Sequence, residues 1–325
     1  MSPSRHLPIR RGAVNSCELV GKFRPPVDVL ALDDTVMPDI FFLIQVLNGV
    51  QYGLLLFLVA SGLTLIFGVM RIINLAHGSF YMLGAYLAFS FAERTGNLWL
   101  AMLIAVPLTV VVGLVLEAAL FRFLYHRDHL YQVLLTYGLI LALEEIRSIF
   151  FGDDVHGVKV PEFLNFSLRL TPTLSYPVYR LFISAVCIAV GAGLYMFINH
   201  TRVGMSVRAG ALNREMVQSL GIDIGLIYRL VFALGVALAA FAGMIAAPVA
   251  SVFPGMGNQI LIISFVVVVI GGIGSVKGAF IGSLLIGLAD TFGQVFARQI
   301  SGITLYLLMI LVLLWRPEGL FGRAT

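Results

Sequence analysis

The sequence has little charge and almost no cysteine. Charged residues make up only 12% of its 325 residues, whereas 59% are hydrophobic and the mean hydropathy is +0.98. Because a soluble globular protein carries about a quarter charged residues, this composition cannot cover a water-facing surface. The two cysteines, Cys17 in the N-terminal tail and Cys187 within an apolar run, argue against a disulfide framework. We therefore expect the chain to reside in a membrane.

Recognisable catalytic and metal-binding motifs are also missing. The sequence contains no CxxC or HExxH pattern, no G-x-S-x-G elbow and no Walker A motif. The segment GGIGSVKG at Gly271–Gly278 resembles a phosphate-binding loop but lacks its G-K-[ST] ending. Basic residues form no run together with aromatic residues, so nucleic-acid binding is not expected. We expect no catalytic residue, no cofactor and no metal ion in this chain.

The first 39 residues form a tail of mixed charge. They contain the pair Pro25-Pro26 and no apolar run of the signal-peptide type. We expect a poorly ordered extension over residues 1–39. A transmembrane domain over 40–317 is expected to follow, with an inside loop at about 200–228 and a C-terminal tail over 318–325.

Nine apolar runs follow the tail, at about 41–70, 72–92, 98–121, 133–151, 180–198, 229–249, 259–273, 279–297 and 303–315. They are too long and too uniformly apolar for barrel strands, so they predict a helical bundle with eight or nine crossings. The seventh and ninth runs are short for a bilayer, which predicts tilted, extended or partly re-entrant segments. Between 152 and 179, three prolines argue against a helix.

Orientation is predicted from the Lys and Arg residues near the ends of the runs. Basic residues are in excess in the 122–132 and 199–229 segments and near the C-terminus. These segments are therefore expected inside, and the more acidic 152–179 loop outside. Nine crossings would place the N-terminal tail outside and the C-terminus in the cytoplasm.

The most informative stretch is Ser61–Tyr86, because three polar side chains interrupt its apolar character: Arg71, Asn74 and His77. One straight helix through the first two runs would rise roughly 80 Å, so the chain must turn near Arg71–Gly78. In a structural interpretation Arg71 marks an inside hairpin, Asn74 caps the next helix and His77 hydrogen-bonds across the bundle. In a functional interpretation Asn74 and His77, with Gly78, line a translocation path or form its inside gate.

The inside loop contains an amphipathic pattern over Met205–Gly221. Apolar residues recur at helical spacing and predict one apolar face: Met205, Ala209, Leu212, Met216 and Leu220. Gly221 is placed as a helix stop. Periodicity alone fits two roles equally, a helix that docks into a groove on a soluble partner and a helix that lies on the lipid surface.

Four carboxylates and a cluster of glycines interrupt the apolar character of the runs. Glu117, Glu144, Glu145 and Asp290 lie within or at the ends of predicted spans, and only Asp290 is expected to be deep. One deep carboxylate favours a helix-to-helix hydrogen bond over a proton pathway. A tight turn between two helices at the inside surface is predicted from Gly271, Gly272, Gly274 and Gly278.

Several segments resemble the branched-chain amino acid ABC permeases, in particular the H-type subunit. The resemblance covers roughly residues 40–323, and the order and spacing of its segments make it specific. The N-terminal tail is longer than the family pattern requires. The matching segments are Gly62–Tyr86, Gly204–Asp223, Phe232–Val249, Val268–Asp290 and Leu313–Arg323.

The resemblance implies an all-α bundle of the type II-like ABC importer permease class in the cell inner membrane. Such a subunit pairs with a second, M-type permease, two cytoplasmic ATPases and an extracytoplasmic binding protein, and moves branched-chain or related aliphatic amino acids. ATP would be hydrolysed on the partner subunits. Arg208, Ala209 and Gly221 match the family's coupling-loop pattern and are the residues that it assigns to the ATPase contact.

Other functions would require other features of the sequence. Urea and short-amide ABC importers have permeases of similar pattern, so the substrate is an open alternative. An ion-coupled secondary carrier would need deep paired carboxylates or unwound helices in two repeated halves, and the sequence has one deep carboxylate and no clear repeat. A membrane enzyme would depend on His77, which has no evident partner in the sequence.

Overall fold

The structure is a computed structural model, and it describes residues 36–125, 127–171, 174–296, 298–299 and 301–322. The expected extension at 1–39 therefore lies almost wholly outside the described residues, as do the last three residues of the expected C-terminal tail. The chain divides into two compact units, Met1–Phe42 and Leu43–Thr325. The fold described below is that of the second unit.

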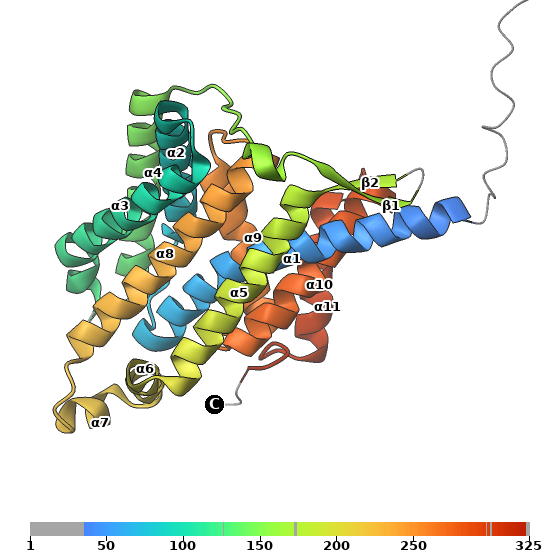
Figure 1. Cartoon of the computed structure of the whole chain (residues 1–325). Coiled ribbons are helices and arrows are strands. Elements are labelled where there is room, and N and C mark those ends of the chain that lie inside the picture. The colour runs from blue at the N-terminus through green and yellow to red at the C-terminus, as the bar shows by residue number, and fades with distance from the viewer. Residues whose placement is uncertain (1–35, 126, 172–173, 297, 300, 323–325) are drawn as a thin grey trace, which may run out of the picture. The chain divides into compact units, whose positions relative to one another are not determined.

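Nine helices of 15 residues or more make up most of the described chain (Figure 1). They are α1 (Val36–Met70), α2 (His77–Thr95), α3 (Leu98–Ala119), α4 (His129–Phe151), α5 (Val178–His200), α8 (Ile224–Ala250), α9 (Met256–Gly271), α10 (Val276–Phe296) and α11 (Ser301–Trp315). Each corresponds to one apolar run of the sequence, which confirms the all-α membrane bundle. By length and composition, five are apolar enough to cross a membrane: α1 from Phe41, α3, α5, α8 and α10.

The shorter elements lie between the long helices. A 3-10 turn, η1 (Phe121–Leu124), follows α3, and a second one, η2 (Glu162–Leu164), follows α4. Next comes an antiparallel hairpin of β1 (Ser167–Thr171) and β2 (Leu174–Pro177), with Leu168 opposite Tyr176. As expected, the described residues of this proline-containing loop form no α-helix before Val178, although η2 is a single 3-10 turn; the hairpin was not predicted.

The segment between α5 and α8 differs from the single helix that its periodicity predicts. It forms α6 (Arg202–Leu212) and α7 (Arg214–Ser219), separated at Asn213. Asn213 has an extended backbone, and its side-chain oxygen accepts a hydrogen bond from Met216 N at 3.0 Å. The asparagine side chain can bond to a nearby backbone N–H group and so compete with continuation of the helix. Asn213, inside the predicted helix, therefore becomes the N-terminal cap of α7.

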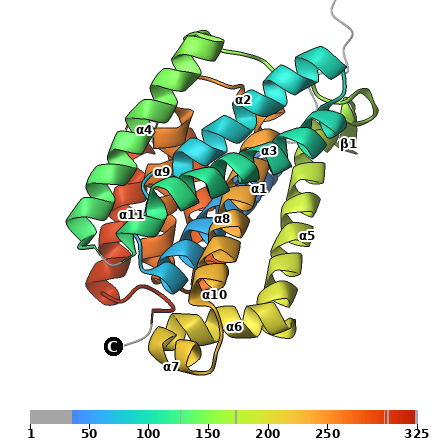
Figure 2. The same cartoon turned by 90° about the vertical axis from the view of Figure 1, so that its left-hand side faces the viewer.

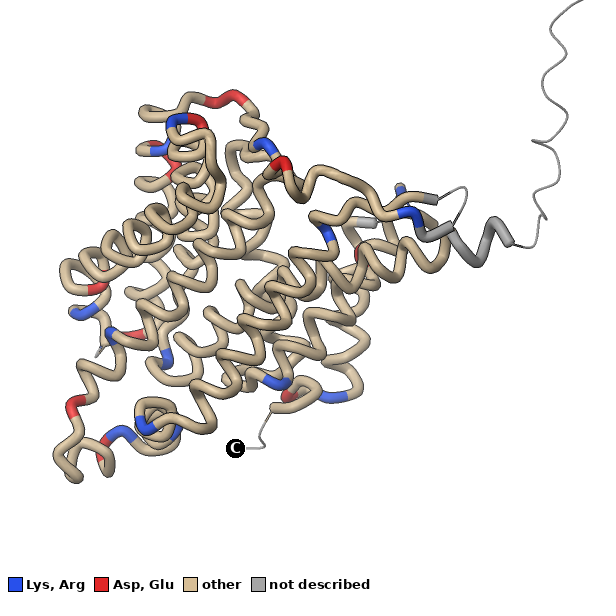
Figure 3. The backbone as a smooth tube through the Cα atoms, in the orientation of Figure 1, with Lys and Arg blue, Asp and Glu red and all other residues tan. Residues whose placement is uncertain are grey.

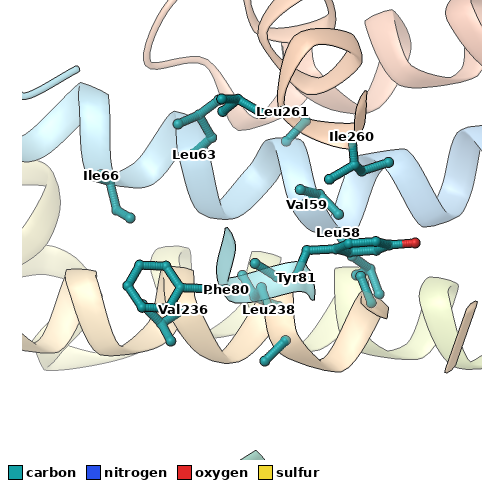
Figure 4. Packing of buried hydrophobic residues seen from close by; sticks show 14 of the residues in the cluster. Leu58, Val59, Leu63, Ile66, Phe80, Tyr81, Val236, Leu238, Ile260 and Leu261 are labelled. Carbon is teal, nitrogen blue, oxygen red and sulfur yellow. The ribbon is translucent and has the colours of Figure 1, made fainter. Parts of the chain in front are cut away.

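Helices α1 and α8 form the centre of the bundle. In the most apolar stretch of each helix, 89% of α1 and 72% of α8 are buried. The corresponding share is 33% or less in α3, α5 and α10. Figure 4 shows side chains of α1, α2, α8 and α9 pointing toward one another in one layer, with Leu58 and Ile66 on α1, Phe80 on α2 and Val236 on α8. The outer helices therefore leave apolar side chains exposed to the surrounding lipid.

Charged residues gather toward two opposite ends of the long helices, and the middle is almost free of them (Figure 3). We call the end that carries α6 and α7 the short-helix end, and the end that carries β1 and β2 the hairpin end. In Figure 2, α6 and α7 lie across the ends of the long helices, where the chain passes from α5 to α8. This distribution of charge is the one that a bilayer requires.

Close approach between helices depends on small residues at their contacts. A Cβ atom added at Gly84 of α2 would lie 2.6 Å from Ala240 Cα of α8, and one added at Gly257 of α9 would lie 2.8 Å from Gly78 O of α2. Membrane helices associate by this kind of backbone proximity, because apolar side chains gain little by leaving lipid.

We predict that Gly84→Val destabilises the protein, because the new side chain must push α2 away from α8. Overpacking of this kind costs about 1–3 kcal/mol or more. The control is Gly138→Val on α4, where an added Cβ has no atom within 4 Å. Thermal unfolding in detergent, followed by size-exclusion chromatography, should give a lower melting temperature for Gly84→Val alone. Equal melting temperatures for the two variants would contradict the packing described here.

Candidate functional site

The break between α1 and α2 lies inside the bundle. Helix α1 ends at Met70, and Arg71 takes a left-handed conformation with φ of +56° while its N–H donates to Phe67 O at 2.9 Å. His77 Nε2, at the start of α2, lies 3.1 Å from Val59 O on α1. Val59 precedes the end of α1 by 11 residues, so α2 begins about 16 Å back along α1 from its end.

The connection from Arg71 to Ala76 is therefore non-helical backbone at membrane depth. Such backbone is tolerated only where protein encloses it. Ile72, Asn74 and Ala76 are all buried, and Arg71 alone is exposed. The turn that the sequence predicts is present. Its first residue, Arg71, is exposed, and the residues that follow it lie in the interior of the bundle.

Asn74 does not cap α2, so that part of the structural interpretation is wrong. The residue at the cap position is Ala76, and no side chain caps the helix. Because Asn74 lies two residues before that position, it contributes its backbone carbonyl, which accepts from His77 N at 3.3 Å. Neither side-chain atom of the Asn74 amide has a hydrogen-bond partner among the described residues.

His77 makes the hydrogen bond across the bundle that the sequence suggested, through Nε2 to Val59 O. Its other ring nitrogen, Nδ1, is buried without a partner in the described chain. Gly78 packs directly on Gly257 of α9. None of Asn74, His77 and Gly78 lines either of the two cavities described next.

A cavity of about 740 Å³ opens at the hairpin end. We call it the hairpin-end cavity. Its walls come from the early part of α1, the first turn of α5, the last turns of α8 and α10, and the first turns of α9 and α11. Its lining reaches Tyr81 on α2, four residues after His77. The cavity therefore extends from the hairpin end to within about one helical turn of the α1–α2 break.

Two opposite charges line this cavity. Arg180 on α5 donates from its guanidinium to Asn48 Oδ1 at 2.9 Å, and the same oxygen accepts from Tyr176 OH at 3.0 Å. On α10, Asp290 Oδ2 accepts from Gln294 Nε2 at 2.7 Å. Sequence reasoning missed Asn48 and Arg180. The sequence does contain a signal for the α1 wall: Gln45, Asn48 and Gln51 are three residues apart within an apolar run, which places their side chains on one face of a helix.

A second, smaller cavity of about 220 Å³ lies at the short-helix end. It is lined by Val69 and Arg71 at the end of α1, by Tyr228 of α8, and by the α6–α7 junction at Gly210–Glu215. The junction therefore adjoins the α1–α2 break.

The predicted contact residues of α6 and α7 fall into two groups. Exposed apolar side chains belong to Met205, Leu212, Met216 and Leu220, whereas Ala209 is half-buried. Gly221 follows α7 with φ of +80°, a conformation that favours glycine. The guanidinium of Arg208 donates to Ile198 O near the end of α5. Arg208 is thus already engaged within the chain and helps to hold α6 on α5.

The carboxylates differ from their expected depths. Glu117 is fully buried near the end of α3 and accepts a hydrogen bond from Tyr125 OH, whereas Asp290 is half-buried on the cavity wall. The bond that Asp290 makes is to Gln294 of its own helix, and not to another helix. Glu144 pairs with Arg147 at 3.1 Å and also accepts from Gly255 N, while Glu145 is exposed.

Arg147 also organises the loop that follows α4. Its guanidinium donates to Gly152 O and pairs with Asp153 at 2.9 Å. Together with the Ser148 hydroxyl, it lowers the pKa of the exposed Asp153 carboxyl below its usual value. At neutral pH this loop therefore keeps its charge pair.

The four glycines of the predicted turn lie at the junction of α9 and α10: Gly271 is the last residue of α9, Gly272 and Gly274 lie between the helices, and Gly278 is in the first turn of α10. Gly272 and Gly274 have φ of +94° and +80°. A Cβ atom added at Gly271 would lie 2.7 Å from Ala279 N. The backbone is thus packed too closely for side chains at Gly271, Gly272 and Gly278, whereas Gly274 is required for its positive φ.

Comparison with known proteins identifies the family of this chain. Residues 45–313 match the family model described as the branched-chain amino acid transport system permease component. The chain belongs to this family. The permease is 34% identical to the high-affinity branched-chain amino acid transport system permease protein BraD of Pseudomonas aeruginosa, over 88% of this chain and 98% of that one.

Two further relatives have the same description. The permease is 29% identical to LivH of Escherichia coli K12, over 87% of this chain and 96% of that one. It is 30% identical to a probable LivH of Methanocaldococcus jannaschii, over 86% and 92%. Among solved structures, PsaBC from Streptococcus pneumoniae in complex with a Fab matches 82% of this chain at 10% identity and a TM-score of 0.45.

We predict that Asn74→Leu leaves the thermal stability of the permease unchanged or raises it. The amide has no hydrogen bond to lose, and an unpaired buried polar group costs about 1–3 kcal/mol. The matched control is Gln132→Leu, because the Gln132 amide is equally buried but donates to Leu124 O and Arg127 O. Thermal unfolding in detergent should show a loss for Gln132→Leu only. A similar loss for both variants would mean that Asn74 is hydrogen-bonded.

Proposed function

We propose that this chain is a transmembrane permease subunit of an ATP-driven ABC importer that moves branched-chain or related aliphatic amino acids across the inner membrane. The observation that carries the proposal is the family match over 45–313, with relatives named as branched-chain amino acid permeases over nearly their whole length. The partners would be an M-type permease, two cytoplasmic ATPases and an extracytoplasmic binding protein. Nucleotide would be hydrolysed on the ATPases.

The short-helix end is proposed to face the cytoplasm. Basic residues on this end include Arg122, Arg202, Arg214, Lys277 and Arg316, whereas in the 152–179 loop of the hairpin end Lys159 and Arg169 are outnumbered by Asp153, Asp154 and Glu162. Positively charged segments are retained on the cytoplasmic side. The hairpin-end cavity would then face the binding protein, and the C-terminus would be cytoplasmic.

Helices α6 and α7 are proposed as the ATPase contact. Support comes from four large apolar side chains exposed beyond the ends of the long helices: Met205, Leu212, Met216 and Leu220. Amphipathic helices with such faces fit apolar grooves of soluble partners. Arg208, Ala209 and Gly221 contribute by holding and shaping these helices, since Arg208 bonds to α5 and Gly221 ends α7.

Transport is proposed to work by alternating access. Closure of the ATPases would displace α6 and α7, whose junction adjoins Arg71 and the end of α1. The α1–α2 break would change with it and open the closed region between the hairpin-end cavity and the cytoplasm. In this proposal Asn74, His77 and Gly78 form the closed gate of the resting state, which is consistent with their burial.

The test of the proposed function is ATP-dependent uptake by the assembled transporter in proteoliposomes. Radiolabelled leucine should enter only with ATP and the binding protein, and ionophores that collapse ion gradients should leave uptake intact. Uptake that stops with the ion gradient would overturn the ABC proposal in favour of a secondary carrier. Uptake of labelled urea without leucine would overturn the substrate class alone.

We predict that Met216→Asp weakens the ATPase contact at least tenfold while membrane insertion stays normal. A carboxylate in place of an exposed apolar side chain must be buried at the proposed interface, at a cost of several kcal/mol. Gln218→Asp is the control, since Gln218 lies two positions along α7 and therefore on the other side of the helix. Co-purification with the ATPases checks both variants. Full co-purification and uptake for Met216→Asp would refute this contact.

We also predict that Asn74→Leu lowers leucine uptake at least tenfold without loss of assembly. A leucine at this position replaces the only side-chain amide between Arg71 and Ala76 with an apolar group. The closed gate would then be wholly apolar there and more stable, so it would open less often. Uptake per assembled complex, with complex yield measured separately, checks the prediction. Normal uptake in a fully assembled Asn74→Leu transporter would assign Asn74 to packing alone.

A further inference from the structure

The hairpin-end cavity combines features of a site for a small zwitterion. Its volume of about 740 Å³ is within the range of about 300–1,000 Å³ typical of small-molecule sites. It carries one cation and one anion on different helices, Arg180 on α5 and Asp290 on α10. Within the described residues, neither side chain forms an ion pair.

Neutral amides hold both charges in place. Asn48 accepts from Arg180, and Gln294 donates to Asp290. These partners orient the two charged groups without neutralising them. A partly buried charge that lacks an opposite charge is costly to remove from water, and a few charged groups in a mostly apolar cavity are typical of small-molecule sites. A ligand with both charges would remove the cost at both positions.

The remaining wall suits an aliphatic side chain. Apolar residues from four helices line the cavity: Leu55 on α1, Val249 on α8, Ile262 and Ile263 on α9, and Leu305 on α11. A free amino acid with a branched aliphatic side chain presents the matching set of a carboxylate, an ammonium group and a small apolar group. Urea or a neutral short amide presents neither charge.

We propose that the hairpin-end cavity is an entry site that binds a zwitterionic aliphatic amino acid, with Arg180 facing its carboxylate and Asp290 facing its ammonium group. This inference rests on the proposed function. It adds a substrate-recognition site within the permease itself, apart from any binding protein. The cavity is large enough to hold water beside one such amino acid, so binding is expected to be weak, as a transient site requires.

The experiment measures how fast a thiol in the cavity reacts with a membrane-impermeant methanethiosulfonate reagent. Thr291 lines the cavity next to Asp290, so Thr291→Cys is introduced into a chain that also carries Cys17→Ser and Cys187→Ala. The assembled transporter is reconstituted without the binding protein, which would itself bind leucine. Millimolar L-leucine should slow modification at least fivefold, whereas urea and isobutyramide should not.

The charge assignments are tested by Arg180→Gln and Asp290→Asn, each added to the Thr291→Cys chain. Each should reduce protection by leucine to less than twofold, and Asp290→Glu should restore part of it. The matched controls are Arg169→Gln and Asp154→Asn, which alter exposed charges at the same end but outside the cavity. Both controls should keep full protection.

The outcomes separate this inference from the function on which it rests. A transporter that imports leucine with ATP but shows no protection at position 291 overturns the entry site alone. Protection that survives both Arg180→Gln and Asp290→Asn overturns the pairing of charges. A complete transporter that imports no aliphatic amino acid overturns the proposed function and this inference with it.

Discussion

Lipid offers no hydrogen bonds, so every backbone group within the membrane must find its partner inside the protein. The interrupted chain between α1 and α2 is kept away from lipid by burial, since Ile72, Asn74 and Ala76 are buried and the helix that follows packs on α1, α8 and α9. The enclosure depends on backbone-to-backbone proximity. A Cβ atom at Gly62 of α1 would lie 2.8 Å from Gly235 O and 3.0 Å from His77 Cε1, and one at Gly68 would lie 2.9 Å from Gly274 Cα. Larger residues there would separate the helices and expose the break.

The same break connects the two ends of the proposed pathway. Tyr81, on the wall of the hairpin-end cavity, follows the start of α2 by one turn, and Arg71, on the wall of the second cavity, precedes it. Along the chain, the first turn of α2 therefore lies between a residue of one cavity wall and a residue of the other. A small rotation of that turn would change the packing of the closed region next to both cavities. A packed core changes between discrete arrangements and does not deform continuously, so a shift of α6 and α7 can be converted into opening or closing here.

The sequence predicted the features that depend on composition and on the periodicity of apolar residues. Nine apolar runs became nine helices, the turn fell at Arg71–Ala76, and the exposed apolar side chains of the inside loop kept their helical spacing. Local chemistry was harder to weigh. Asn213 ended a helix because its side chain could cap the next one, whereas Asn74 did not cap because the helix began three residues later. Both residues have the same propensity, and only the position of the helix start distinguishes them.

The hairpin-end cavity could not be predicted because it depends on which helix faces meet. Polar residues on α1 and α10 carry a spacing signal, but Arg180 lies at the start of α5 and joins them only through the fold. The burial of Glu117 was not predicted for the same reason. Glu117 is near the end of its helix yet fully buried, because η1 returns over it and Tyr125 donates to it. Position along one helix does not determine exposure when the next segment folds back.

The unpaired groups of the break bear on how the gate would function. Asn74 and one nitrogen of His77 are buried without partners in the described chain, and each such group costs about 1–3 kcal/mol. A closed gate that carries this cost is less stable than one with an apolar residue at the same place. Under the proposed mechanism, opening would let water or the substrate bond to these groups and recover part of that energy. The cost in the closed state thus lowers the energy that ATP-driven movement of α6 and α7 must supply.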